Sequence, residues 1–143
     1  DPKKGDFSQY RGVTSLTPNQ KEAGEACAMV IEDIASLRSA GEKLLQRTGA
    51  EAVLITRGEH GMALYESGGA EHHLATEATT VYDVTGAGDT VIAVYTAALA
   101  AGADFAPAAA LANHAAGLAV RELGTTAVTA DQLRAALDAK EQE

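Results

Sequence analysis

The sequence has few of the residues that build aromatic cores or bind polyanions. Trp is absent and aromatic residues make up only 4% of the 143 positions, so a core must be built from Ala, Leu, Val and Ile. Eleven basic residues stand against twenty acidic ones, which gives a net charge of −9. This balance argues against nucleic acid and against an anionic membrane surface as partners held by bulk charge. A phosphorylated ligand would need local help from backbone amides.

Cysteine and uninterrupted apolar runs are scarce as well. Cys27 is the only cysteine, so no internal disulfide can form, and we interpret it as a small buried hydrophobe. The longest apolar stretch, 86–103, is interrupted by Asp89, Thr90 and Thr96, and no signal peptide is visible. We therefore expect a cytoplasmic protein with one domain of ordinary size.

The pattern of the first half favours an α/β fold. A short strand is predicted over 13–16, and apolar residues at helical spacing predict a helix over 36–48 that Gly49 ends. The continuous apolar run 52–56 is typical of a buried parallel strand. Helices followed by such strands indicate the α/β class.

The most informative stretch is the glycine-rich turn within 83–90. Gly86 and Gly88 flank Ala87, Asp89 follows, and an apolar run of helical type begins directly after. Backbone amides at such a helix N-terminus form a site for an anion, because they are unpaired and lie at the positive end of the helix dipole. Asp89 could then accept a proton from a substrate hydroxyl. From the residues alone, a helix start in which Asp89 only stabilises the dipole is an open alternative.

This turn closely resembles the second signature of the ribokinase-like (PfkB-type) sugar kinases, in which an Asp and a small spacer precede Gly-Ala-Gly-Asp and a helix. The resemblance implies that Asp89 is the catalytic base and that Gly86, Ala87 and Gly88 form the anion hole. It also implies a ribokinase-like three-layer α/β/α fold. The match departs at Val94, where the family usually has a small residue.

A second motif precedes the predicted helix that follows Pro18. Asn19 and Glu22 match the family's Asn-x-x-Glu pattern. The resemblance implies that both organise the metal–phosphate region, with Glu22 acting on Mg²⁺ through water. From the residues alone, Asn19 is a helix cap and Glu22 a first-turn partner of the helix dipole.

A third motif follows the strand at 52–56. Thr56, Gly58 and Gly61 have the family's Thr-x-Gly-x-x-Gly spacing, and open α/β sheets bind ligands at this end of their strands. The resemblance implies that these residues contact the nucleotide. The alternative is a plain hairpin loop that leads into a strand beginning at Met62.

The last third supplies weaker signals. A helix is predicted over 108–121, started by Pro107 with Asp104 as a candidate cap. Asn113 and Ala116 match family positions that wall the adenine pocket. A place for Asn113 on the wetted face of the helix is the alternative.

The final segments complete the resemblance. A loop and short strand over 124–128 resemble the segment that closes under the adenine and, in many members, binds a monovalent cation. The resemblance implies a candidate K⁺ site with help from Asp83 and Thr85. Thr129 and Gln132 have capping-box spacing and predict a last amphipathic helix.

The segments 1–3, 7–12 and 16–19 look most like the kinase module of the bacterial ADP-heptose pathway. That module phosphorylates D-glycero-D-manno-heptose 7-phosphate at O1, and several members carry a fused nucleotidyltransferase domain. The resemblance implies that residues 1–143 are the C-terminal ATP-binding and catalytic part of one sugar-kinase domain, whose N-terminal half is absent from this sequence. ATP, Mg²⁺, a sugar phosphate and a homodimer are the expected cofactors and partners, and the chain alone is expected to have little or no activity. Another PfkB-type kinase (ribokinase, fructokinase or phosphofructokinase-like) or a non-catalytic nucleotide-binding module are the alternatives.

Overall fold

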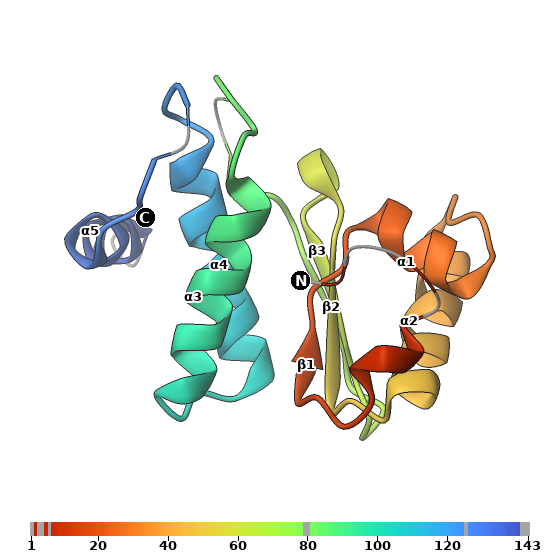
Figure 1. The fold of residues 1–143 in the computed structure, drawn as a ribbon. Coiled ribbons are helices and arrows are strands. Elements are labelled where there is room, and N and C mark those ends of the chain that lie inside the picture. The colour runs from red at the N-terminus through yellow and green to blue at the C-terminus, as the bar shows by residue number, and fades with distance from the viewer. Residues whose placement is uncertain (1, 3–4, 6, 79–80, 125, 141–143) are drawn as a thin grey trace. The chain divides into compact units, whose positions relative to one another are not determined.

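The computed structural model describes residues 2, 5, 7–78, 81–124 and 126–140. Its contacts divide the chain into two units, residues 1–74 and residues 75–143, and each is described by itself (Figure 1). Of the segment 1–3, which carries part of the resemblance, only Pro2 lies within the described residues.

The first unit is built on a mixed four-stranded sheet. Its strands, in spatial order, are β1 Ser15–Leu16, β2 Ala52–Thr56, β3 Met62–Glu66 and β4 Glu71–Leu74. β1 pairs with β2 in parallel, whereas β2 with β3 and β3 with β4 are antiparallel. The strand at 52–56 is confirmed and its first four residues are buried, and β1 is its only parallel neighbour among the described strands.

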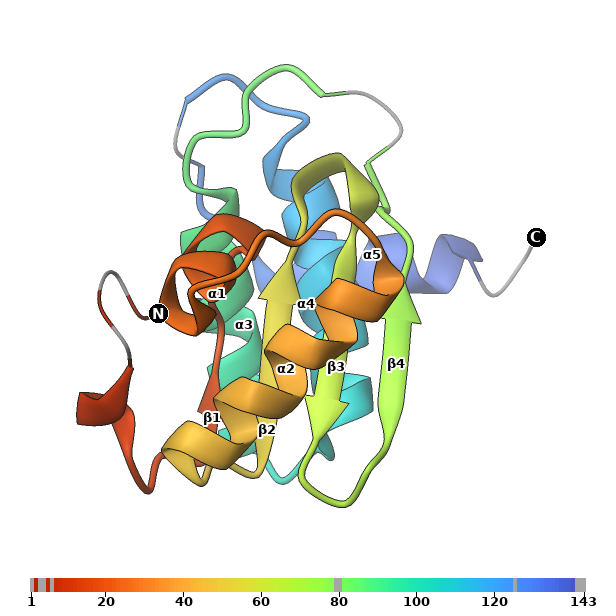
Figure 2. The same cartoon turned by 90° about the vertical axis from the view of Figure 1, so that its right-hand side faces the viewer.

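Two helices pack against this sheet. α1 covers Gln20–Cys27 and α2 covers Ile34–Thr48, and α2 crosses the face formed by β2 and β3 (Figure 2). Leu37 and Leu44 of α2 are fully buried. Gly49 ends the helix in the left-handed conformation with φ 66°, as its position predicts.

α2 approaches the sheet most closely at Gly41. A Cβ built there would lie 2.3 Å from Cδ2 of the Tyr65 ring, so only glycine fits. The ring itself is buried, and burial raises the pKa of Tyr65 to about 12. The missing side chain at position 41 therefore makes room for the largest side chain of β3.

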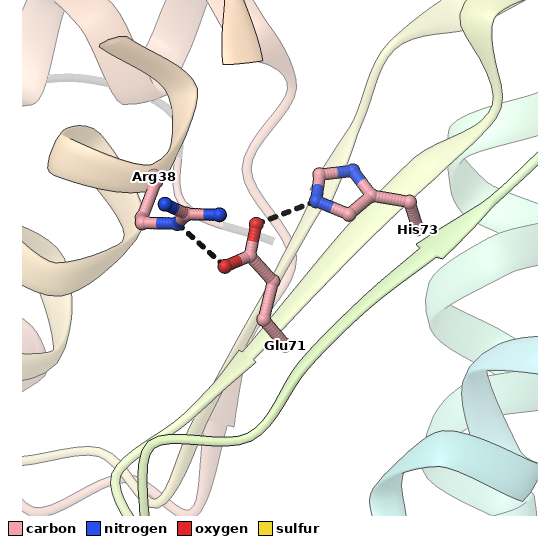
Figure 3. A network of polar contacts seen from close by, with 3 residues as sticks. All are labelled: Arg38, Glu71 and His73. Carbon is pink, nitrogen blue, oxygen red and sulfur yellow. Dashed lines mark hydrogen bonds and ion pairs between the residues drawn. The ribbon is translucent and has the colours of Figure 1, made fainter. Parts of the chain in front are cut away.

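A charged network joins α2 to the edge strand β4 (Figure 3). Arg38 Nε donates to Glu71 Oε2 at 2.6 Å, and His73 Nε2 lies 2.6 Å from Glu71 Oε1. Glu71 thus lies between two side chains, and its hydrogen bonds with Arg38 and His73 hold the pKa of its carboxyl below the usual value.

The segment 7–12, which carries part of the resemblance, packs against the rest of the first unit before β1 begins. Phe7 is 1% exposed and packs edge-on against Tyr10, with ring centroids 5.6 Å apart, beside the 3-10 turn Ser8–Tyr10. The amide of Gly12 donates to the carbonyl of Thr48 at 2.9 Å. This segment therefore fastens the chain before β1 to the end of α2.

The second unit consists of helices. α3 covers Ala87–Ala100, α4 covers Phe105–Ala119 and α5 covers Ala130–Lys140. α3 and α4 lie side by side (Figure 1), and small side chains of α4 are buried, among them Ala108, Ala112 and Ala115. Thr129 and Gln132 form the predicted reciprocal cap of α5, with hydrogen bonds of 2.9 and 3.2 Å.

Two predictions for this unit are wrong, the start of a helix at Pro107 and a short strand within 124–128. α4 begins at Phe105, so Pro107 lies inside its first turn, where a missing N–H costs nothing. Asp104 stands at the N-cap position, but its side chain makes no capping hydrogen bond. The described residues 124 and 126–128 form no strand, because they pair with no other extended segment.

Among the described residues, each helix is either too short or too polar to span a lipid bilayer.

Candidate active site

The glycine-rich turn opens α3 as the sequence predicts. Gly86 is the N-cap with φ 83°, a conformation that favours glycine. Asp89 is the third residue of the helix, and its side chain faces solvent. The carboxylate is therefore accessible to a ligand at the helix N-terminus.

The amides of this turn are unequally placed for an anion. The first intrahelical bond runs from the Thr90 amide to the Gly86 carbonyl at 2.9 Å, so the amides of Gly88 and Asp89 precede it. The Ala87 amide donates to the Val84 carbonyl at 3.2 Å and would have to exchange this acceptor for a phosphoryl oxygen. Gly88 and Asp89 thus carry the best-placed candidate donors.

Asp83 joins two loops of the second unit. Its Oδ1 accepts from the Thr85 amide at 2.9 Å and its Oδ2 accepts from the Gly124 amide at 3.0 Å. Hydrogen bonds from Thr85 and from the Gly124 amide lower the pKa of the Asp83 carboxyl. The sequence motif gave no sign of the contact with Gly124, which lies 41 residues along the chain.

Asn113 is 5% exposed, so the interpretation that places it on the wetted face of α4 is wrong. Its Nδ2 donates to the Ala75 carbonyl at 2.6 Å. One turn later, a Cβ at Gly117 would lie 3.0 Å from the Glu77 backbone. These residues hold the segment 75–78 against α4, and sequence reasoning missed Gly117. Ala116, on the same helix, is half-buried.

In the first unit the predicted nucleotide motifs lie together. The Thr56 amide donates to the Pro18 carbonyl at 3.0 Å, and Asn19 forms a parallel bridge with Thr56. The motif residues Asn19 and Thr56 are thus neighbours where the parallel strands β1 and β2 end. That edge is where open α/β sheets bind ligands.

Asn19 and Glu22 form a complete capping box. Asn19 Oδ1 accepts from the Glu22 amide at 2.9 Å, and Glu22 Oε2 accepts from the Asn19 amide at 2.8 Å. The helix-cap interpretation of both residues is therefore confirmed. Among the described residues, no group of three His, Cys, Asp or Glu side chains is placed to hold a metal ion.

Gly58 and Gly61 lie in the hairpin between β2 and β3. The 3-10 turn Gly58–His60 fills this loop, and both glycines have positive φ, of 57° and 75°. The Arg57 amide donates to the Gly61 carbonyl at 2.8 Å. The hairpin interpretation is confirmed, and Gly58 is exposed beside the end of β2.

A family model described as "pfkB family carbohydrate kinase" matches residues 1–132. The chain belongs to this family of carbohydrate kinases. It is 55% identical over 137 residues to the bifunctional protein HldE of Nitrosococcus oceani, covering 96% of this chain and 29% of that protein. HldE of Desulfatibacillum aliphaticivorans is 50% identical over 137 residues, covering 96% and 28%. The chain thus spans less than a third of the length of these curated relatives.

Solved structures confirm the ribokinase-like α/β fold. A structure of Arabidopsis thaliana ribokinase complexed with ribose and ATP matches with a TM-score of 0.83 and 27% identity, covering 90% of this chain and 42% of that one. Escherichia coli phosphofructokinase-2 in complex with substrates and products matches with a TM-score of 0.82 and 19% identity, covering 93% and 44%. At that lower identity the likeness concerns the fold alone.

Proposed function

We propose that this chain supplies the ATP-binding and catalytic part of a kinase that phosphorylates O1 of D-glycero-D-manno-heptose 7-phosphate. Family membership supports a carbohydrate kinase, and the identity of about half to the HldE relatives supports this sugar. The observation that carries the proposal is the exposed Asp89 carboxylate in the first turn of α3, directly after the Gly86 turn.

In the proposed reaction, the oxygen of the sugar hydroxyl attacks the γ-phosphorus of ATP while Asp89 accepts the proton of that hydroxyl. A new bond forms between the sugar oxygen and phosphorus, the bond to the β–γ bridging oxygen breaks, and ADP leaves. The amides of Gly88 and Asp89 stabilise the charge on the transferring group. Removal of one such donor typically costs about 3 kcal/mol of barrier.

The nucleotide phosphates are assigned to the end of β1 and β2. This edge is formed by Asn19, Thr56, Gly58 and Gly61. Gly58 is exposed, so a phosphate could approach the backbone there closely. Glu22 is proposed to orient a Mg²⁺ ion through water, and such an ion would supply positive charge beside the phosphates. Glu22 has one oxygen committed to the helix cap, so the other is the one left for this task.

The adenine is assigned to α4. Ala116 is proposed to contact the base, and Asn113 to shape the pocket through its hydrogen bond to Ala75.

A K⁺ site at Asp83 and Thr85 stays a prediction. Measurement of kinase activity at increasing K⁺ concentration tests it. The carboxylate of Asp83 accepts two main-chain hydrogen bonds, from Thr85 and from Gly124.

The name of the relatives, a bifunctional protein, agrees with a second activity in the complete protein. We propose that a fused nucleotidyltransferase domain supplies it. Assay of the complete protein for nucleotidyl transfer to a heptose 1-phosphate tests this part separately from the kinase.

The substrate is tested by incubating the complete protein with ATP, Mg²⁺ and one of several sugars, with ³¹P NMR of the product. We expect ADP and a new phosphate at O1 with D-glycero-D-manno-heptose 7-phosphate. Ribose, fructose and fructose 6-phosphate are expected to give kcat/KM lower by at least about 10²-fold, because a site built for a substrate's polar groups rejects sugars that lack them. Preference for one of these sugars would contradict the assignment.

A non-catalytic nucleotide-binding module is the second candidate function. The exposed carboxylate at position 89 favours the kinase, because a module that only binds nucleotide has no use for a base beside the anion site. Tight ATP binding without ADP formation for every sugar phosphate would favour the module.

A further inference from the structure

We propose that Asp83 is a positioning residue: its carboxylate latches the loop that carries the anion hole to the loop that follows α4. The proposal rests on the proposed function, because it assigns Asp83 a part in phosphoryl transfer. It concerns a residue that does not itself touch the reacting atoms.

The evidence is a set of three hydrogen bonds between the two segments and one hydrogen bond within the first segment. Asp83 Oδ2 accepts from the Gly124 amide at 3.0 Å, while Oδ1 accepts from the Thr85 amide at 2.9 Å. The amides of Tyr82 and Asp83 both donate to the Val120 carbonyl, at 2.8 and 3.3 Å. Asp83 is thus bonded through its main chain to one side of the loop after α4, and through its side chain to the other.

The loop has little else to hold it. Val84 is 70% exposed and Thr85 is exposed, so neither is anchored by burial. Among the described residues, the other main-chain hydrogen bond of this loop runs from the Ala87 amide to the Val84 carbonyl, and that bond lies within the loop itself. Two residues separate Asp83 from Gly86, so the position of Asp83 sets where the anion-hole amides begin.

Aspartate suits this duty better than other small residues. A carboxylate offers two acceptor oxygens, whereas an asparagine side chain offers one oxygen and two N–H donors, which repel an amide donor. Charge-assisted hydrogen bonds to backbone amides are also stronger than neutral ones. Asp83→Asn should therefore keep one bond and lose the other, and Asp83→Ala should lose both.

The kinetic test compares these variants in the complete protein, at saturating Mg²⁺ and at several K⁺ concentrations. We expect kcat to fall about 10-fold for Asp83→Asn and about 100-fold for Asp83→Ala, because a displacement of about 1 Å in a positioned group costs this much. KM for ATP and for the sugar phosphate should stay nearly constant. The matched control is Asp104→Asn, the same change at an exposed carboxylate of the same unit without a capping bond, which should keep kcat.

A second readout does not depend on activity. Hydrogen exchange should speed up in both segments, 82–88 and 120–124, in Asp83→Asn, and neither should change in Asp104→Asn. Unchanged exchange over 120–124 would overturn the latch. Faster exchange in both segments with kcat unchanged would overturn the positioning role.

Two other outcomes are also decisive. If raising the K⁺ concentration restores kcat in Asp83→Asn, the carboxylate is a cation ligand and the proposal is wrong. Failure of the kinase assignment is seen separately, as a wild-type protein that forms no ADP with any sugar phosphate. In that case the proposed function fails, and the positioning role fails with it even where the exchange data support the latch.

Discussion

Several side chains of the sequence motifs have structural roles that the residue type alone does not predict. Asn19, Asp83 and Asn113 were all matched to ligand-binding positions, yet each side chain is hydrogen-bonded within its own unit. Asp89, by contrast, faces solvent. Burial and hydrogen bonding therefore separate the residue with the clearest chemical role from those that shape its surroundings.

Replacement of Asn113 by alanine should lower the stability of the protein. The Ala75 carbonyl would lose its donor in a buried place, which costs about 1–3 kcal/mol. Urea unfolding measured by circular dichroism checks this. Stability equal to that of the wild type would show that the amide serves a ligand rather than the fold.

Replacement of Gly41 by alanine should also destabilise the protein, although alanine is the better helix former by about 1 kcal/mol. The added Cβ would lie 2.3 Å from the Tyr65 ring, and overpacking of this kind typically costs about 1–3 kcal/mol. Gly68→Ala is the control, because nothing lies within 4 Å of its Cβ and its φ is not positive. A rise in the melting temperature of Gly41→Ala would contradict this packing.

At the scale of elements, local signals in the sequence were strong where they act within a few residues. The helix end at Gly49, the strand at 52–56 and the cap formed by Thr129 and Gln132 are all confirmed. The strand expected within 124–128 is absent among the described residues there. A strand needs a partner segment to pair with, and the local sequence pattern does not predict that partner. The apolar run of β2 likewise does not predict that its other neighbour, β3, is antiparallel, because the hairpin between the two strands sets that direction.

The α1 cap offers a way to separate structure from function at Asn19. Asn19→Ser keeps an acceptor for the Glu22 amide, whereas Asn19→Ala loses it and should cost about 1 kcal/mol of stability. If Asn19 also orients nucleotide phosphates, as proposed, Asn19→Ser should raise KM for ATP while stability is kept. Kinetics and thermal unfolding of both variants measure the two effects. Wild-type KM for ATP in Asn19→Ser would limit this residue to the cap.

The connection between α2 and β4 should depend on pH. The pKa of Glu71 is lowered by Arg38 and His73, so its contribution to stability is present above the ordinary carboxyl pKa and is lost as the pH falls through the lower, folded value. Glu71→Gln should therefore lower the melting temperature at pH 7, and the difference from wild type should shrink below about pH 4. Glu51→Gln, at an exposed glutamate, is the control. A difference that stays constant with pH would contradict the network.

At the scale of the whole molecule, the resemblance supplied what local patterns could not. Family, fold and the position of Asp89 at a helix start were predicted from the motif and are confirmed. The residues that support the site were not predicted, because Gly117 against Glu77 and Asp83 with Gly124 are contacts between segments far apart in sequence. Such contacts leave no short-range pattern.

The function as a whole depends on a base at position 89. The most direct measurement is the kcat of Asp89→Asn in the complete protein, with ATP affinity measured in parallel by calorimetry. We predict a loss of about 10²–10⁴-fold in kcat, because the amide cannot accept the sugar proton, with ATP affinity largely kept. Turnover close to that of the wild type would contradict the account.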